Sequence, residues 1–172
     1  LISQEQQKRA AIALGLVGGP RLLLLDEPAA GINPEETDDL GRLIRRIAEA
    51  GVTVCLIEHK MKMVMGLCDR IMVLHHGRKI AEGTPRELIA AHLEPDVVEV
   101  YGGDAQALST GPLRALASRV EVSGETVFFY TQDAAPLMQA LAHEHTLRSL
   151  HRPANLEDLF LKLTGRQIRE DA

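Results

Sequence analysis

Apolar positions in the first third of the chain switch between strand-like runs and helical spacing. The run Leu22–Leu25 is too short for a helix and is bounded by turn residues, so it predicts a strand buried on both faces of a parallel sheet. Apolar residues then recur at helical spacing from Leu40 to Ile47, and a second buried strand is expected at Val52–Ile57. Strand, helix and strand in this order predict a right-handed crossover with parallel strands. We therefore expect an α/β fold.

Polar residues mark where the predicted helices begin and end. Ser3 followed by Gln6 has the form of a capping box, which would open a first helix. Asn33 and Pro34 supply a cap and a first-turn proline for the second helix, and Gly51 would end it. A plain capped helix accounts for Ser3 and Gln6 without any binding function.

Ionisable residues stand at the ends of both predicted strands. Asp26 and Glu27 follow the first strand, and His59 follows the second. Because parallel strands end at one edge of a sheet, where ligands bind in open α/β folds, we expect the three side chains to lie near one another. Asp26 could hold Mg²⁺, and Glu27 could take a proton from a water that attacks a phosphate. A solvated acidic turn explains the two carboxylates equally well, and a lone histidine after a strand is usually structural.

Five segments in this order resemble the ATP-binding subunits of ABC transporters. They are Ser3-x-x-Gln6-Gln7-Lys8-Arg9, Ala11-Ile12-Ala13, Leu22–Pro28, Gly31–Pro34 and Ile57–His59. They are similar to the signature motif, the Walker B strand, the D-loop and the switch histidine of that family. The resemblance covers residues 1–90 and looks most like subunits of branched-chain amino acid importers. It implies the C-terminal part of a P-loop NTPase (RecA-like) core with a parallel sheet.

The resemblance implies roles for the residues in these segments. Asp26 would support Mg²⁺, Glu27 would polarise the attacking water, and His59 would contact the γ-phosphate. The signature segment would be presented to ATP held by a second ATPase subunit, of the same or a different kind; its residues are Ser3, Gln4, Glu5 and Gln6. Membrane-spanning transporter subunits would be the other partners, at the cytoplasmic face of the membrane.

Two departures from the family pattern argue against activity of the chain alone. Nothing matches Gly-x-x-x-x-Gly-Lys-Ser/Thr, the loop that holds ATP phosphates. We therefore expect the C-terminal part of a longer protein, which would neither bind ATP tightly nor hydrolyse it by itself.

The second departure lies in the signature, where Gln4 and Glu5 replace two glycines. Glycines let a backbone approach a phosphate closely, and a carboxylate about 4 Å from a phosphate charge would cost about 4 kcal/mol at an effective dielectric of about 20. Either the site is degenerate and paired with a competent subunit, or the sequence is imperfect. A non-hydrolysing partner or regulatory subunit is accordingly the alternative function.

The second half of the chain predicts a smaller module. We assign residues 1–94 to a partial ABC ATPase domain and residues 95–172 to a linker and a small α+β accessory domain. A hairpin with a turn at His75-His76-Gly77 and a helix opened by Thr84 precede this boundary. After a short strand at Val97–Tyr101, Gly102-Gly103-Asp104 and Gly111-Pro112 indicate a linker, and the order ββαβα follows from Arg119.

The tail has a resemblance of its own. Residues 155–166, with segments near residues 97 and 122, resemble ABC-2-type exporter ATPases, including rhizobial nodulation exporters for lipo-chitooligosaccharides. The front half and the tail thus point to different subfamilies, and the direction of transport stays open. His143 and His145 are better explained as incidental than as a metal pair.

Bulk properties narrow the function classes. The 172 residues carry a formal net charge of −5, which gives no broad basic surface for nucleic acid. No apolar run approaches the length that spans a membrane. Cys55 and Cys68, in predicted core elements and without paired spacing, fit free thiols. An ABC ATPase of DNA repair or translation is disfavoured, because neither a coiled-coil insertion nor a tandem cassette is present.

Overall fold

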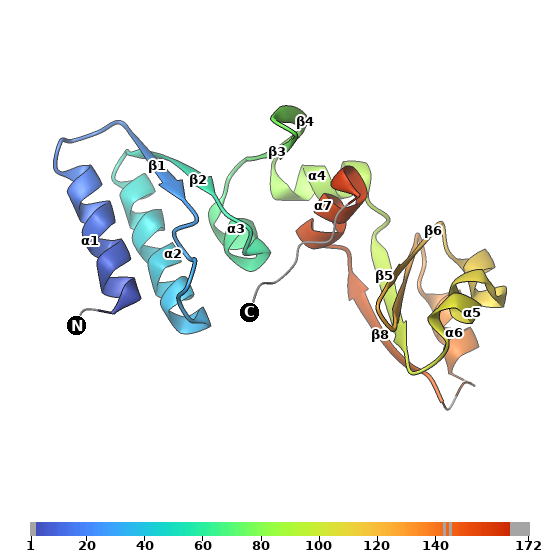
Figure 1. Ribbon diagram of the computed structural model, residues 1–172. Coiled ribbons are helices and arrows are strands. Elements are labelled where there is room, and N and C mark those ends of the chain that lie inside the picture. The colour runs from blue at the N-terminus through green and yellow to red at the C-terminus, as the bar shows by residue number, and fades with distance from the viewer. Residues whose placement is uncertain (1–2, 143, 145, 166–172) are drawn as a thin grey trace. The chain divides into compact units, whose positions relative to one another are not determined.

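The structure, a computed structural model, describes residues 3–142, 144 and 146–165. The chain divides into two compact units, Leu1–Asp69 and Arg70–Ala172, which are described separately (Figure 1). The predicted division of the chain after residue 94 concerns the domains of the family and stays a prediction.

The first unit combines helices with a pair of parallel strands. Its elements are α1 (Gln4–Leu16), β1 (Leu22–Asp26), α2 (Pro34–Glu49), β2 (Thr53–Ile57) and α3 (Met61–Leu67). The two strands run in parallel, with Leu22 opposite Thr53 and Asp26 opposite Ile57. The predicted strand–helix–strand order and the α/β class are thereby confirmed.

The predicted capping box at Ser3 is present, and the predicted cap residue Asn33 forms a second one. The Ser3 hydroxyl accepts a hydrogen bond from the Gln6 backbone N–H at 3.1 Å, and the Gln6 side chain accepts one from the Ser3 N–H at 3.0 Å. Asn33 and Glu36 form the same reciprocal pair at the start of α2, at 2.9 and 3.2 Å. These bonds satisfy N–H groups that have no partner within a helix, which explains where α1 and α2 begin.

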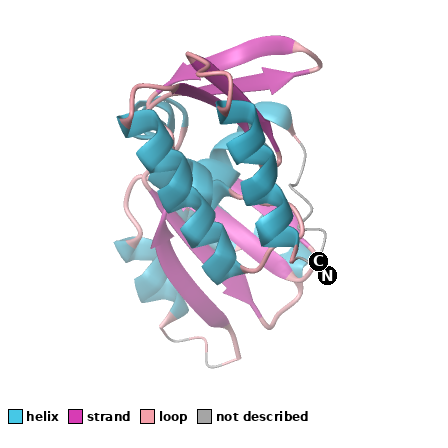
Figure 2. Ribbon diagram, turned by 90° about the vertical axis from the view of Figure 1, so that its left-hand side faces the viewer, coloured by secondary structure: helices cyan, strands magenta, loops and turns pink. Residues whose placement is uncertain are grey.

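Among the described residues of the first unit, helices cover one face of the β1–β2 pair. Helices α1 and α2 lie side by side (Figures 1 and 2), and Leu23 is buried in the core that they share with β1. Leu24 is 69% exposed and Ile57 is 63% exposed. The prediction that both strands are buried on both faces is therefore wrong for this chain: the described helices pack on one face, and alternate side chains of each strand point away from them. Cys55 is exposed for the same reason.

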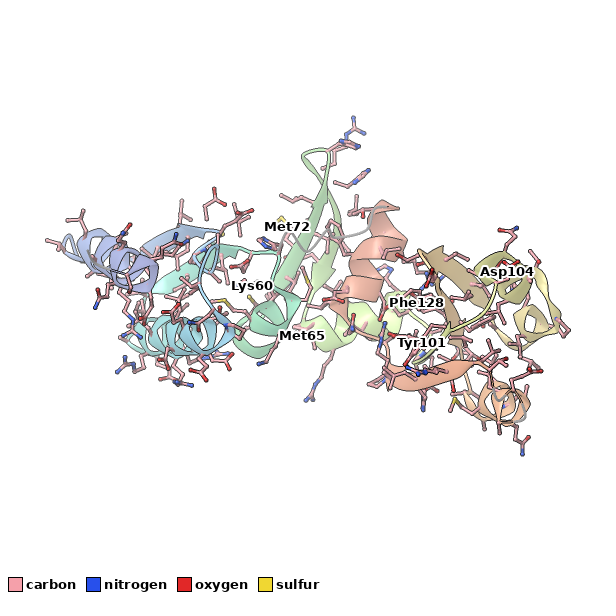
Figure 3. All side chains as sticks on the ribbon, turned by 60° about the horizontal axis from the view of Figure 1, so that its bottom comes forward. Lys60, Met65, Met72, Tyr101, Asp104 and Phe128 are labelled. Carbon is pink, nitrogen blue, oxygen red and sulfur yellow. The ribbon has the colours of Figure 1, made fainter. Side chains whose placement is uncertain are left out.

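Helix α3 buries the face that carries Met63 and Val64. Met63 and Val64 are buried, whereas Met65 is 40% exposed (Figure 3). Successive residues of a helix point about 100° apart, so a face centred on Met63 and Val64 leaves Met65 toward solvent.

The second unit begins with a hairpin and a capped helix. Strands β3 (Ile71–His75) and β4 (Arg78–Gly83) pair in antiparallel fashion, as predicted. Both turn residues, His76 and Gly77, have positive φ angles, of 48° and 74°, as a two-residue hairpin turn requires. Thr84 caps α4 (Pro85–His92) through a third capping box, with Glu87.

The rest of this unit is a four-stranded antiparallel sheet with helices. Its elements are β5 (Asp96–Tyr101), α5 (Ala105–Thr110), the 3₁₀ helix η1 (Pro112–Leu116), β6 (Arg119–Ser123), β7 (Thr126–Thr131), α6 (Ala135–Leu141), β8 (Arg148–Pro153) and α7 (Leu156–Thr164). The strand order is β6-β7-β5-β8. Residues of α5, η1 and α6 pack against Val98 and Phe129 on one face of the sheet.

Two predictions for this region need correction. The short strand at residues 97–101 does not precede the module but lies inside its sheet, between β7 and β8. The predicted linker holds α5 and η1; Asp104 caps α5 by accepting bonds from the Gln106 and Ala107 N–H groups (Figure 3). The cap residue and the apolar residues after it, which pack against the sheet, give this segment a regular structure although it contains glycines. His143 and His145 lie outside the described residues.

A buried carboxylate joins α7 to the sheet. Asp158, 3% exposed, accepts hydrogen bonds from the Arg152 guanidinium at 2.7 and 3.0 Å and from the Tyr130 hydroxyl at 3.0 Å. Burial alone would lower the pKa of Arg152, but its bonds to Asp158 and Glu99 raise that pKa above the ordinary value. Burial of the Tyr130 hydroxyl is the main cause that raises its pKa, and the negative charges of Asp158 and Glu121 raise that pKa further. Arg152 therefore stays charged and Tyr130 stays a neutral donor to Asp158.

Replacing this carboxylate tests its contribution to stability. Asp158→Ala removes two of the hydrogen bonds of the mostly buried Arg152 guanidinium and leaves the Tyr130 hydroxyl with only a long bond to Glu121, so we expect the free energy of unfolding to fall by about 3–5 kcal/mol in urea titrations. Glu157→Ala, at the preceding, exposed position of α7, is the matched control and should change the free energy of unfolding by less than about 0.5 kcal/mol. Equal effects of the two substitutions would contradict this account.

Candidate functional site

The carboxyl ends of β1 and β2 bring Glu27 close to His59. The Glu27 backbone N–H donates to the Ile57 carbonyl at 2.9 Å, which extends the pairing of Asp26 with Ile57 by one residue. Glu27 Oε1 then lies 3.7 Å from His59 Nδ1, and both side chains are about half exposed. The two residues come from separate strands, and the parallel pairing places their side chains at one edge.

The backbone of Glu27 is strained. Its φ angle of 42° lies in the left-handed region, which non-glycine residues rarely adopt and which costs about 1–3 kcal/mol. Two hydrogen bonds hold the Glu27 backbone in this conformation. Its N–H donates to the Ile57 carbonyl, and its carbonyl accepts from Lys8 Nζ at 3.0 Å. Strain of this kind gathers at functional sites, where it fixes the direction of a side chain. Lys8 was not among the predicted site residues.

Asp26 ends β1 as an exposed carboxylate. Within the described ranges, no three His, Cys, Asp or Glu side chains gather closely enough to hold a metal ion. A lone exposed carboxylate nevertheless fits Mg²⁺, because this ion keeps several waters and is usually bound through one or two carboxylates together with substrate phosphates. The site thus suits a metal that arrives with a nucleotide rather than a resident one.

The segment Ser3–Gln6 lies against the loop between β1 and α2. At Gly31 φ is 73°, a conformation that favours glycine, and a Cβ atom there would meet the end of the Gln4 side chain. Glu5 forms an ion pair with Arg9, at 2.6 Å. Arg9 offsets part of the negative charge that was expected to repel a phosphate. The i, i+4 spacing of the pair was visible in the sequence.

Two residues that the sequence analysis passed over organise the site. Glu58, whose side chain is fully buried, accepts hydrogen bonds from the N–H groups of Ala29, His59 and Lys60. The Lys60 ammonium donates to the Ile32 carbonyl at 3.0 Å. Their position next to a histidine at a strand end was the available signal.

Comparisons with known proteins give relatives over nearly the whole chain. A family model described as the C-terminal domain of the nodulation factor export protein NodI matches residues 100–165. The Nod factor export ATP-binding protein I of Cupriavidus metallidurans is 44% identical over 169 residues, which are 98% of this chain and 55% of that protein. The protein of the same name from Sinorhizobium fredii is 42% identical, over 98% of this chain and 49% of its own length.

A solved structure of a nucleotide-free ATP-binding cassette from an ABC transporter is also similar. It is 30% identical, with a TM-score of 0.47, and the match covers 48% of this chain and 33% of that one.

The chain resembles the C-terminal portion of an ATP-binding subunit of ABC transporters. Its curated relatives are Nod factor export ATP-binding proteins, and the chain spans about half of their length. Because the alignments cover 98% of the chain, the same relatives match both the front half and the tail. No described helix is both long and apolar enough to cross a membrane.

The contact between Gly31 and Gln4 predicts an effect on stability. Gly31→Ala adds a methyl group at a positive φ and against Gln4, so we expect a loss of about 1–3 kcal/mol in the free energy of unfolding. Gly41→Ala is the matched control: it lies inside α2 with open space around its Cβ and should gain about 0.5–1 kcal/mol. Urea titrations that gave both variants the same sign would contradict the role of Gly31.

Proposed function

We propose that this chain is the catalytic C-terminal portion of the ATP-hydrolysing subunit of an ABC exporter. The observation that carries the proposal is the placement of Glu27. Its strained backbone is fixed to β2 through Ile57, and its carboxylate lies 3.7 Å from His59. A half-exposed carboxylate held in one direction suits the orientation of a water for attack on a phosphate.

Each residue at this edge takes one task in the proposal. Glu27 orients the attacking water and accepts its proton, and His59 hydrogen-bonds the γ-phosphate. Asp26 would hold Mg²⁺, which when bound neutralises charge on the transferred phosphate. Phosphoryl transfer depends mainly on such positioning and charge stabilisation, so few protein groups are needed at this edge. The loop that cradles the other phosphates would belong to a part of the subunit outside this sequence.

The partners follow from the same proposal. Ser3, Gln4, Glu5 and Gln6 would face ATP bound to a second ATPase subunit, so that the working unit is a dimer. The dimer would couple hydrolysis to membrane-spanning subunits, at the cytoplasmic face of the membrane. The names of the relatives favour an exported substrate of the Nod factor class, a lipo-chitooligosaccharide.

Removal of the proposed base is the direct test. In a subunit that carries this sequence together with a phosphate-binding loop, Glu27→Gln should lower ATP hydrolysis by about 100-fold or more, because general-base catalysis contributes about that factor. Bound ATP should be retained, since glutamine keeps the shape and loses only the basic oxygen. Hydrolysis is measured by phosphate release and retention by filter binding.

Glu35→Gln, at an exposed position near the start of α2, is the control and should hydrolyse ATP as the unmodified subunit does. Normal hydrolysis by the Glu27→Gln variant would overturn the proposed role of Glu27.

A specific observation favours a second candidate, a non-hydrolysing partner subunit. Ser3 and Gln6 already satisfy each other's backbone N–H groups, and Gln4 and Glu5 place side chains where the family pattern has glycines. A phosphate at this helix start would have to compete with these bonds.

The two candidates respond differently to repair of the signature. The double substitution Gln4→Gly and Glu5→Gly should raise ATPase activity by about tenfold or more if side chains at the helix start impair closure on ATP. Arg9→Gln in the unrepaired subunit breaks the ion pair while Gln4 and Glu5 keep their side chains, and so separates the effect of the ion pair from that of the backbone. If the repaired subunit showed no gain, the signature would not be the cause of impairment and the non-hydrolysing candidate would lose its support.

A further inference from the structure

The loop that carries His59 is tied to the loop between β1 and α2 at two places. Glu58 makes the first tie. One of its oxygens accepts from the Ala29 N–H at 3.0 Å, and the other accepts from the N–H groups of His59 at 2.7 Å and Lys60 at 3.2 Å. The two oxygens of a single carboxylate thus bind one loop each.

The first tie is costly to break. The Glu58 side chain is fully buried, and a buried carboxylate is stable only when hydrogen bonds compensate its charge. Bonds from N–H groups to a charged acceptor are about twice as strong as neutral ones. If either loop moved away, Glu58 would lose part of this compensation.

Lys60 makes the second tie, in the opposite direction. Its ammonium leaves the His59 loop and donates to the Ile32 carbonyl at 3.0 Å and to the Thr37 hydroxyl at 3.3 Å. The Thr37 hydroxyl in turn donates to the Asn33 carbonyl at 2.8 Å. Figure 3 shows Lys60 between β2 and α3, where its side chain can make this connection. The second loop is thereby held near both of its ends, at Ala29 and at Ile32–Asn33.

We propose that Glu58 and Lys60 are positioning residues that clamp the His59 loop to residues 28–33, so that the two loops move as one element. The consequence for function rests on the proposed contact of His59 with the γ-phosphate. A shift of His59 on phosphate binding or release would then carry the loop containing Gly31 with it. Gly31 lies against Gln4 of the signature segment. Binding or release of the γ-phosphate at His59 would therefore displace the segment that is proposed to face a second subunit.

Amide hydrogen exchange and NMR on the chain without nucleotide test the clamp. Lys60→Met removes the ammonium and keeps the length of the side chain. If the loops move as one, exchange of the Ala29 and His59 amides should become about tenfold faster, and the ring signals of His59 should shift, because loss of the two bonds of the ammonium frees both loops. Neither residue is bonded to the Lys60 ammonium, so a local role of Lys60 would leave them unchanged.

Two further variants, one at Lys60 and one at Lys62 in α3, serve as controls. Lys60→Arg can donate to the same carbonyl and should restore slow exchange at Ala29. Lys62→Met removes an exposed lysine, paired with Asp38, from the same helix and should not alter exchange in either loop. Unchanged Ala29 and His59 amides in Lys60→Met, or equal effects of Lys60→Met and Lys62→Met, would overturn the proposal.

Glu58→Gln gives a second, independent measurement. Glutamine keeps one acceptor oxygen, so it can serve the Ala29 side or the His59–Lys60 side but not both. Exchange should rise at one side by about tenfold while amides in the middle of β1 and β2 keep their rates. If this variant does not fold, Lys60→Met alone decides. Because no nucleotide is present, these results are independent of whether Glu27 hydrolyses ATP.

Discussion

The parallel pairing of β1 with β2 is the constraint on which the functional edge depends. The register that sets Leu22 opposite Thr53 ends with Asp26 opposite Ile57, and one further bond, from the Glu27 N–H to Ile57, closes it. A slip of one residue would turn every side chain of a strand to the other face. Leu23 would then leave the core that α1 and α2 share with it, so the apolar core and the placement of Glu27 near His59 are fixed by the same register.

The local elements of the first unit could be predicted because their signals are local. The capping box at Ser3, the cap residue Asn33 and the helical spacing of α2 are complete within a few residues, and each appears in the structure as expected. The common edge of Glu27 and His59 also followed, since parallel strands must end on the same side. Burial could not be predicted in the same way. The exposed side chain of Leu24 depends on which elements lie over β1, and a run of leucines looks the same with one covered face or two.

Long-range relations explain the remaining differences. Strand β5 pairs with β7 and β8, whose residues lie about 30 and 50 positions further along the chain, and nothing near Val97 indicates either partner. The bonds of Glu58 and Lys60 are hidden for the same reason, since Ala29 and Ile32 lie far from them in sequence. The hydrogen bonds that Glu58 accepts come from backbone N–H groups, which every residue except proline carries, so no sequence pattern reveals them.

The start of α1 shows how one segment serves two competing purposes. A helix start is favourable for an anion because it offers free N–H groups and positive potential. Here the Gln6 N–H is bound by the Ser3 hydroxyl, and Glu5 gives the first turn a negative charge that also stabilises the helix. The ion pair of Glu5 with Arg9 leaves the carboxylate in place while reducing its net field. A phosphate would therefore gain the helix potential only by displacing bonds that hold the helix end. Stability of α1 and affinity for a phosphate draw on the same N–H groups, so the segment cannot be optimal for both.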